Sequence, residues 1–493
     1  MKQPTYPSLY QINTRVWLTE LSRDLGRRAT FDDIPDTSLD DLEKLGFDWI
    51  WFLSVWCTGV LGRKVSRENP DFLRDFELTL PDLCEEDIAG SGFAISDYKV
   101  HPDLGGKEAL HRLRDRLHQR GLKLMLDFVP NHMGPDHPWV EEYPDFFVSG
   151  TADDLEKYPQ NYTRLKCMHG EKIFAYGRDP YFAGWPDTIQ LDYSNPSNVN
   201  AMTKELLRIA DQCDGVRCDM AMLILPAVFE KTWDHVAHPF WSIAIKAVRE
   251  KFPDFLFMAE VYWDMEWTLQ QEGFNYTYDK RLYDRLRDGE QGSIRGHFCA
   301  GPDYQEKLAR FLENHDEPRA ASTFDHKKHE AAALITFLSP GLRFFHHGQF
   351  EGRKKRISPH LIRAPKESPD TAVQKFYYAL LNIIRKSVFR NGRWQLLNCV
   401  SAWEGNYTCN SFIAFAWDEA ENMRALVTVN YAPHASQCFV HLPFTDMDGK
   451  SFQFTDLMSD SVYVREGDDL LSRGLFLDLP AWGYHVFEIS ERS

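Results

Sequence analysis

Short apolar runs alternate with amphipathic segments along most of the chain. Residues 107–120 carry Leu110, Leu113 and Leu117 at helical spacing, and a glycine follows the segment as a left-handed helix cap would. Residues 122–129 then form an almost continuous apolar run, which predicts a strand that is buried on both faces. This alternation predicts successive β–α units and therefore a parallel sheet.

The same alternation recurs as far as about residue 390. Helices are predicted at 38–45, 197–213, 239–251 and 325–338, and strands at 10–18, 49–55, 122–129, 215–220, 255–261, 273–277, 308–314 and 342–347. Strands in this number and arrangement predict a closed (β/α)₈ TIM barrel of the α/β class. The catalytic groups of such a barrel come from the carboxyl ends of its strands.

Two stretches interrupt this pattern. Residues 133–195 lie between the third strand and its helix, are rich in Pro, Tyr, Asp and Gly, and are too long for an ordinary loop. They predict an inserted domain, which divides the barrel into residues 1–132 and 196–390. From residue 391 to 493 the helical period is lost, and short apolar runs separated by turn residues predict a C-terminal antiparallel β-sandwich.

Composition and charge narrow the class of protein. The chain has 493 residues, of which 43% are apolar and 26% charged, and this balance argues against disorder. Its net charge of −17 disfavours nucleic acid and anionic membranes as partners. The longest uncharged stretch, residues 49–62, is too short to span a bilayer. The N-terminal residues lack the apolar core of a signal peptide, and the nine cysteines lack CxxC spacing, so we expect a cytoplasmic enzyme with reduced thiols.

Carboxylates occur where four of the predicted strands end. One buried carboxylate is as consistent with a helix cap or an ion pair as with catalysis. Asp219, Glu260 and Asp316 lie on three separate strands, and that combination favours a catalytic site. The four segments concerned are 127–132, 215–221, 257–263 and 311–319.

Two carboxyl groups that face each other suit glycoside hydrolysis, in which one attacks the sugar and the other protonates the leaving oxygen. Arg217 lies two residues before Asp219, so the period of a strand places both on one face, and we expect the guanidinium to hold Asp219 ionised. Glu260 lies among apolar residues, which would raise its pKa as an acid requires. His132 and His315 are candidate donors to sugar hydroxyls.

These segments resemble, in order and spacing, the motifs of the α-amylase family of retaining glycoside hydrolases. Two further stretches, 92–98 and 348–352, also resemble family motifs, so the likeness extends along the whole chain. It implies a TIM barrel with an inserted domain B and a C-terminal sandwich. The residues that carry the four principal motifs are Asp127, Asn131 and His132; Gly215, Arg217 and Asp219; Glu260; and Asn314, His315 and Asp316.

The resemblance also implies roles. Asp219 would be the nucleophile, Glu260 the general acid/base, and Asp316 the group that grips the sugar hydroxyls in the transition state. Asp127 would be structural. The residues implied to bind the sugar at the −1 subsite, where cleavage occurs, are Phe93, His132, Arg217 and His315, with Phe93 replacing the usual Tyr.

The chain departs from the family's starch-degrading members at two positions. Met222 and Leu223 replace the Lys and His that grip acceptor-side sugars, which predicts poor activity on starch unless these side chains face the core instead. Asn131 matches a calcium ligand of the family, so a structural calcium is a candidate. Asp153, Asp154 and Asp187 of the inserted domain could supply oxygen ligands, although solvated loop acids explain them equally well. No metal is required by the chemistry itself.

The leading hypothesis is a retaining glycosidase that acts on α-glucosidic bonds of oligosaccharides or short glucans. A transglycosylase or glucoside isomerase would use the same three carboxylates and transfer the glycosyl group to a sugar instead of water. A non-catalytic carbohydrate-binding protein is a third alternative, which the presence of all three carboxylates disfavours.

Overall fold

The computed structural model describes residues 4–168, 170–419 and 423–492, and its centre is a closed barrel of eight parallel strands. The strands are hydrogen-bonded in the order β1-β14-β13-β12-β11-β10-β5-β2. The predicted TIM barrel is confirmed. The barrel strands are β1 (Ser8–Asn13), β2 (Trp49–Leu53), β5 (Lys123–Phe128), β10 (Gly215–Cys218), β11 (Leu256–Ala259), β12 (Tyr276–Tyr278), β13 (Leu308–Arg310) and β14 (Leu342–His346).

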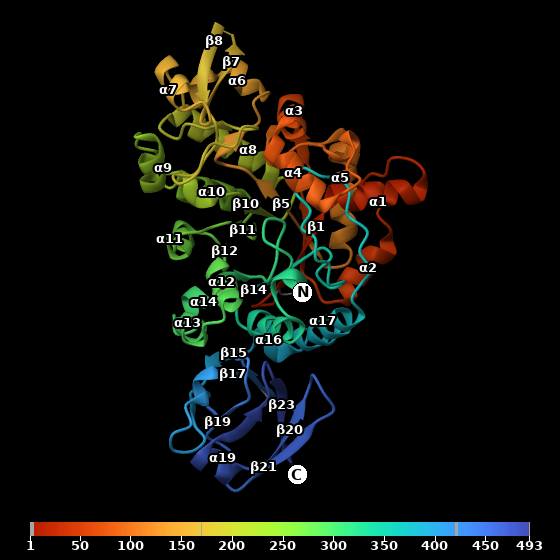
Figure 1. Cartoon of the computed structure of the whole chain (residues 1–493), viewed down its shortest axis with the longest axis vertical. Helices are drawn as coiled ribbons and strands as arrows, with labels where there is room; N and C mark the ends of the chain where they lie inside the picture. Colours follow the sequence, from red (N-terminus) through yellow and green to blue (C-terminus); the bar gives the residue numbers. More distant parts are fainter. Residues whose placement is uncertain (1–3, 169, 420–422, 493) are drawn as a thin grey trace.

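Helices surround the barrel (Figure 1). α5 (Gly106–His118) lies where a helix is predicted, and it buries Leu110, Leu113 and Leu117. The helices that correspond to the other predicted segments are α2 (Asp36–Lys44), α8 (Pro196–Ala210), α10 (Trp241–Lys251) and α16 (His326–Phe337). None of the helices in the described residues is long and apolar enough to cross a membrane.

The first strand is shorter than predicted. β1 ends at Asn13, and α1 (Thr14–Leu25) begins immediately, so the predicted strand over 10–18 is wrong in its second half. The Asn13 side chain accepts a hydrogen bond of 3.3 Å from the Val16 backbone N–H. This N-cap gives the Val16 N–H a hydrogen-bond acceptor at the start of the helix, where the backbone has none to offer. The helix therefore begins at Thr14, and the strand cannot continue.

The chain leaves the barrel after β2 and again after β5. The first excursion holds α3 (Val60–Glu68) and α4 (Pro70–Thr79), flanked by β3 (Trp56–Thr58) and β4 (Ile95–Val100), and it was not predicted. The second, within 133–195, forms most of the upper part of Figure 1. Its elements are α6 (Pro138–Glu142), α7 (Ala152–Lys157), β7 (Tyr162–Cys167), β8 (Gly170–Ala175) and β9 (Ile189–Gln190), and β9 pairs with β6 (His132–Met133).

Two antiparallel sheets follow the barrel. The larger has six strands in the order β15-β17-β18-β23-β20-β21, and the smaller has the order β16-β19-β22. An apolar cluster joins their facing sides, so the predicted β-sandwich is confirmed. The strands are β15 (Arg393–Leu396), β16 (Cys399–Ser401), β17 (Phe412–Glu419), β18 (Met423–Asn430), β19 (Ser436–Val440), β20 (Ser451–Asp456), β21 (Val462–Glu466), β22 (Leu475–Leu479) and β23 (Tyr484–Arg492).

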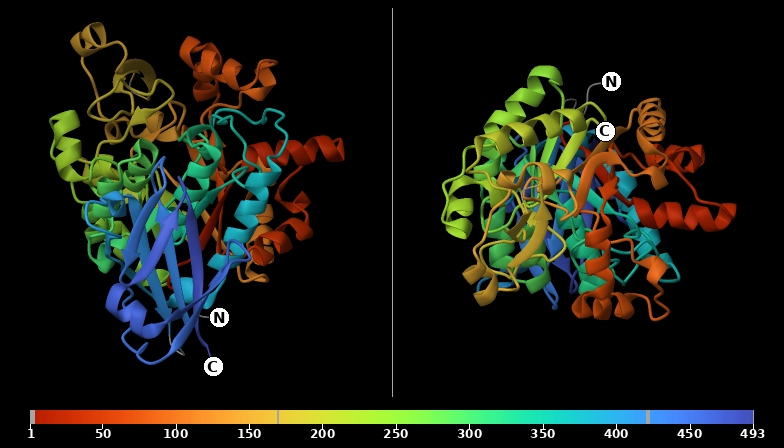
Figure 2. Two further views of the ribbon diagram at one scale, coloured as in Figure 1. Left: turned by 60° about the horizontal axis from the view of Figure 1, so that its bottom comes forward. Right: turned by 90° about the horizontal axis from the view of Figure 1, so that it is seen from above.

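The outer face of the larger sheet shares one apolar core with the barrel. The Trp417 indole N–H donates to the Leu338 carbonyl at 2.8 Å, and the Tyr431 hydroxyl donates to the Leu286 carbonyl at 2.7 Å. Figure 2 shows the blue strands of the sheet against the end of the barrel that lies opposite the inserted segment.

Candidate active site

The predicted carboxylates meet at one rim of the barrel, because the strands that carry them are parallel. Asp219 comes directly after β10, and its N–H donates to the Phe128 carbonyl at the end of β5 at 2.8 Å. Glu260 comes directly after β11, and its N–H donates to the Cys218 carbonyl at 3.0 Å. The hydrogen bonds between barrel strands thus continue one residue beyond β10 and β11. They hold the backbone of Asp219 and Glu260 in place, and so fix the positions from which the two side chains extend.

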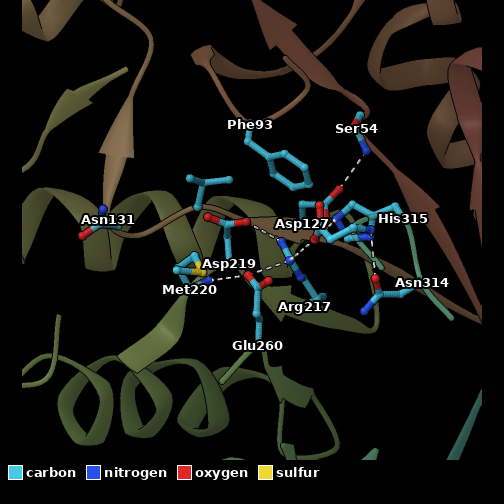
Figure 3. Close-up of polar contacts among 12 residues, drawn as sticks. Ser54, Phe93, Asp127, Asn131, Arg217, Asp219, Met220, Glu260, Asn314 and His315 are labelled. Atoms are coloured by element: carbon cyan, nitrogen blue, oxygen red, sulfur yellow. Dashed lines mark hydrogen bonds and ion pairs between the residues drawn. The ribbon is translucent and has the colours of Figure 1, made fainter. Parts of the chain in front are cut away.

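Arg217 lies between the carboxylates (Figure 3). Its Nη1 is 2.6 Å from Asp219 Oδ1, and its Nη2 is 2.7 Å from Glu260 Oε2 and 3.9 Å from Asp316 Oδ2. The arginine side chain is fully buried, whereas that of Asp316 is 39% exposed. One guanidinium therefore contacts three carboxylates, and the group opens toward solvent on the Asp316 side.

The three carboxylates differ in pKa. Burial raises the pKa of Glu260 to about 7, although Arg217 acts in the opposite direction. Burial also raises the pKa of Asp219 above its ordinary value despite the contact with Arg217, which is contrary to our expectation that the guanidinium would dominate. For Asp316, the His315 ring and Arg217 outweigh the effect of burial and lower the pKa to about 2. A proton on this group of carboxylates thus resides most readily on Glu260.

Two donors orient the Glu260 carboxyl group. The Met220 backbone N–H donates to Oε2 at 2.7 Å, and the Tyr262 hydroxyl donates to Oε1 at 2.9 Å. Met220 has a φ of 42°, a left-handed conformation that is unfavourable for a side chain of its size and that turns its N–H toward the acid. Sequence reasoning missed both residues, although a hydroxyl two positions after the predicted acid was a readable signal for Tyr262.

Phe93 and His315 lie beside this group, as the resemblance implies. The Phe93 ring is 5.4 Å from the His315 ring, and the Arg217 guanidinium lies 5.2 Å from the Phe93 centroid. His315 has its Nδ1 2.8 Å from the Gln11 amide nitrogen and its Nε2 3.0 Å from Asp316 Oδ2. The half-buried Phe93 ring is thus held next to the carboxylates by cationic and aromatic neighbours.

Asp127 is held as a structural acid. Its Oδ1 accepts from the Trp51 indole at 3.1 Å, and its Oδ2 accepts from the Ser54 N–H at 2.8 Å. The side chain is fully buried, and burial raises its pKa. Its oxygens bind the neighbouring strand, which agrees with a role outside the chemistry.

His132 and Asn131 lie where β6 meets β9. His132 packs on Trp185 with ring centroids 5.3 Å apart, and burial lowers its pKa to about 3, so it is neutral at ordinary pH. Asn131 exchanges amide hydrogen bonds with Gln190, which donates to Asn131 Oδ1 at 3.0 Å and accepts from Nδ2 at 3.2 Å.

This environment of Asn131 does not fit a calcium site. Its amide group is already paired with another amide, and calcium prefers several carboxylate or carbonyl oxygens. Of the acids considered for such a site, Asp153 pairs with Lys157 and Asp154 caps α7 through Thr151. Asp187 is buried, and burial raises its pKa to about 6, so it is held apart from solvent without a described ion-pair partner. Within the described residues, no three His, Cys, Asp or Glu side chains gather as metal ligands would.

Met222 and Leu223 are core residues. They lie in the short 3₁₀ helix Ala221–Ile224, with exposures of 0% and 2%, and they belong to the main apolar cluster. The prediction that they form an apolar acceptor surface is therefore wrong, because the left-handed turn at Met220 redirects the chain inward. The exposed Tyr181 ring lies against the half-buried ring of Trp263, three residues after Glu260, with ring centroids 5.0 Å apart.

Comparisons with known proteins agree with this geometry. A family model described as "Alpha amylase, catalytic domain" matches residues 37–379. "Alpha-amylase MalA" of Haloarcula japonica is 26% identical over 357 residues, covering 71% of this chain and 44% of that protein. "Alpha-1,4-glucan:maltose-1-phosphate maltosyltransferase" of Cereibacter sphaeroides is 29% identical over 250 residues, covering 49% of this chain and 30% of that protein. The chain thus spans less than half the length of these two relatives.

Solved structures share the whole architecture. The maltogenic alpha-amylase AmyB from Thermotoga neapolitana superposes with a TM-score of 0.70 at 18% identity, and 98% of each chain is covered. At this identity the likeness establishes the fold, which includes the barrel, the inserted segment and the C-terminal sheets.

Proposed function

Because the chain belongs to the α-amylase family of glycoside hydrolases, we propose that it cleaves α-glucosidic bonds of oligosaccharides or short glucans with retention of anomeric configuration. The observation that carries this proposal is the contact of one buried guanidinium with three carboxylates. Retaining enzymes need two carboxyl groups about 5–5.5 Å apart. Asp219 and Glu260 bind adjacent nitrogens of Arg217, which favours this short separation.

In the first step, Asp219 attacks the anomeric carbon while Glu260 gives its proton to the leaving oxygen. The bond from carbon to the leaving oxygen breaks, and an ester bond to Asp219 forms. Arg217 favours the ionised form of Asp219, and the raised pKa of Glu260 keeps the acid protonated near neutral pH. Asp316 remains ionised because its pKa is about 2, so it can accept hydrogen bonds from sugar hydroxyls and stabilise positive charge at the anomeric centre.

In the second step, the deprotonated Glu260 removes a proton from water, and the water oxygen attacks the anomeric carbon. The bond from that carbon to the Asp219 oxygen breaks, which releases the sugar and the Asp219 carboxylate. Tyr262 and Met220 donate to the two oxygens of Glu260 and therefore hold the carboxyl in one orientation through both steps. The half-buried Phe93 ring offers an apolar surface for the face of the sugar that is attacked.

A screen of α-linked di- and oligosaccharides, with the first-formed anomer followed by NMR, tests this proposal. We expect cleavage that yields the α-anomer first, and loss of cleavage in the Asp219→Asn variant. A first product in the β configuration, or unchanged cleavage by Asp219→Asn, would contradict it.

The second candidate function is transfer of the glycosyl group to a sugar, as a transglycosylase or glucoside isomerase would do. It is favoured by the aromatic pair Tyr181 and Trp263, on which an acceptor sugar could stack, and by the similarity to a maltosyltransferase. Product analysis with a concentrated sugar acceptor distinguishes transfer from hydrolysis. A non-catalytic carbohydrate-binding role would instead give no product with either water or sugar.

The length of the preferred substrate is open. The expectation of poor activity on starch rested on Met222 and Leu223, and both side chains are buried in the core. Comparing rates on soluble starch with rates on maltose and maltotriose measures this preference directly.

A further inference from the structure

Outside the catalytic centre, a surface cavity of about 500 Å³ gathers four arginines. It lies between α1, α3 and the segment that precedes β4, on the side of the molecule where Figure 1 shows α1 and α3. The arginines come from parts of the chain that are distant in sequence. They are Arg15, Arg28, Arg63 and Arg67.

Arg15, at the start of α1, has no carboxylate partner within the described chain. Its Nη1 donates to the Gly90 carbonyl at 2.7 Å, and its Nη2 donates to the Thr58 hydroxyl at 3.3 Å. These contacts orient the guanidinium, and no carboxylate of the described residues forms an ion pair with it. Burial and the nearby Arg63 lower the pKa of Arg15 to about 10, although Asp127 acts in the opposite direction, so it stays charged at neutral pH.

Arg63 also lacks a carboxylate partner within the described chain. It projects from α3 and is exposed, and none of the described residues forms a hydrogen bond or ion pair with its side chain. The other two arginines are paired: Arg28 contacts Asp103, and Arg67 lies 2.5 Å from Glu85. The cavity therefore holds two guanidinium groups that form no ion pair with a described carboxylate, while Glu86 and Asp103 supply acidic groups to its lining.

His101 supplies a further donor in the wall of the cavity. Its Nδ1 accepts from the Asp103 N–H at 3.1 Å, so in the neutral ring the proton is on Nε2. Burial lowers its pKa, and the charges of Arg15, Arg63 and Arg28 act in the same direction, while Asp103 opposes them. Three guanidinium groups thus act on one imidazole.

Positive groups placed together repel each other and lower stability unless an anion compensates them. In a chain with a net charge of −17, such a local excess indicates a binding site. The planar guanidinium fork matches the paired oxygens of phosphate, and Arg15, Arg63 and His101 line the cavity from three separate parts of the chain. We propose that this cavity binds a phosphoryl group, either as inorganic phosphate or as the phosphate of a sugar ester.

Calorimetric titration of the whole protein with inorganic phosphate, against chloride at equal ionic strength, tests the site. We expect saturable binding of phosphate that weakens at least about tenfold in Arg63→Gln. Arg74→Gln is the matched control, because Arg74 lies on the neighbouring α4, is 73% exposed and forms an ion pair with Asp71 at 3.3 Å, outside the lining of the cavity. It should bind phosphate like the wild type. Lack of saturable binding, or equal weakening in both variants, would overturn the proposal.

Arg63→Gln is expected to fold normally, since the Arg63 side chain forms no hydrogen bond or ion pair with a described residue. A melting temperature that falls by the same amount in chloride and in phosphate would assign the arginine to the fold instead, and would overturn its role in binding. Arg63→Lys, which keeps the charge but loses the planar fork, should bind phosphate with intermediate affinity.

Two further titrations identify the source of the phosphoryl group. The first titration uses glucose 6-phosphate. If it binds at least about tenfold more tightly than inorganic phosphate, and if Arg63→Gln weakens that binding, the ligand is a sugar ester. Equal affinities would identify free phosphate. Binding of glucose as tight as that of its phosphate would show that the cavity recognises the sugar alone, contrary to the proposal. Because the cavity shares no lining residue with the carboxylate centre, these outcomes are independent of whether Asp219 is the nucleophile.

Discussion

Two arginines inside the barrel have similar burial but opposite surroundings. Arg217 on β10 is 0% exposed and contacts three carboxylates, whereas Arg310 on β13 is 1% exposed and contacts one, Asp279. Arg310 also donates to the Pro340 carbonyl at 2.6 Å, and Asp279 accepts from His297 at 3.0 Å. Charge is balanced around Arg310 and strongly negative around Arg217.

The pKa values follow this difference. His297 and Arg310 outweigh the burial of Asp279 and lower its pKa, so the ionised pair is stable. Around Arg217, burial prevails and raises the pKa of both Asp219 and Glu260. A balanced buried pair supports the fold, while a crowded group of carboxylates lowers stability and is retained for its chemistry.

Asp219→Asn should have the largest effect on activity. The amide cannot form the glycosyl ester, so the barrier should rise by about 5 kcal/mol or more while the protein remains folded. Initial rates on the best α-glucoside, together with circular dichroism, check both parts. A variant that keeps a tenth of the wild-type rate would show that Asp219 is not the nucleophile.

Asp279→Asn should lower the stability of the protein and leave its catalytic activity unchanged. It leaves Arg310 buried without its counter-charge, which typically costs about 3–5 kcal/mol of unfolding free energy. Urea unfolding measures the loss, and the catalytic rate per folded molecule should be close to that of the wild type. If Asp279→Asn loses no more unfolding free energy than Asp219→Asn does, the surroundings of Arg310 and Arg217 do not differ in their effect on stability.

Glu260→Gln should stabilise the protein in a pH-dependent way. The pKa of Glu260 rises from an ordinary value of 4.5 to about 7 on folding, so the unfolded chain loses its proton first as pH increases. The cost of burying the acid is therefore absent below pH 4.5, grows between 4.5 and 7, and is complete above 7. We expect a gain of about 3 kcal/mol at pH 8 that disappears toward pH 4.5. A gain that does not vary with pH would contradict this assignment.

The smallest expected effect is that of Tyr262→Phe on the pH profile. kcat/KM of the wild type should fall above about pH 7, where Glu260 loses its proton. The Tyr262 hydroxyl donates to the carboxylate, so its removal should raise the pKa of Glu260 and shift the alkaline limb upward by less than about one pH unit. If Tyr262→Phe lowers kcat/KM but leaves the alkaline limb of the pH profile at the same pH, Tyr262 contributes to packing and does not set the pKa of Glu260.

The barrel and its carboxylates could be predicted because they depend on local order along the chain. Apolar strands alternate with helices, and Asp219 and Glu260 each follow a strand directly, so the topology of the barrel brings them together. The direction of Met222 could not be predicted in the same way. It depends on the left-handed turn at Met220, and a methionine carries no sequence signal for that conformation.

The arginine cavity could not be predicted for a different reason. Arg15, Arg63 and His101 lie on three elements that become neighbours only after the chain folds, and no spacing in the sequence relates them. The excursion that carries Arg63 was also missed, because its short helices do not belong to the alternation of strands and helices.

The core shared by the barrel and the six-stranded sheet affects how the molecule can be divided. Trp417 and Tyr431 are part of the same apolar cluster as the barrel helices, so the sheet forms one wall of the core that it shares with those helices. We expect the two to melt in a single cooperative transition. Cutting the chain near residue 391 would expose that wall to water and leave an aggregation-prone barrel. The catalytic rim therefore depends on strands at the opposite end of the molecule, and the smallest unit that can be transferred to another protein includes both.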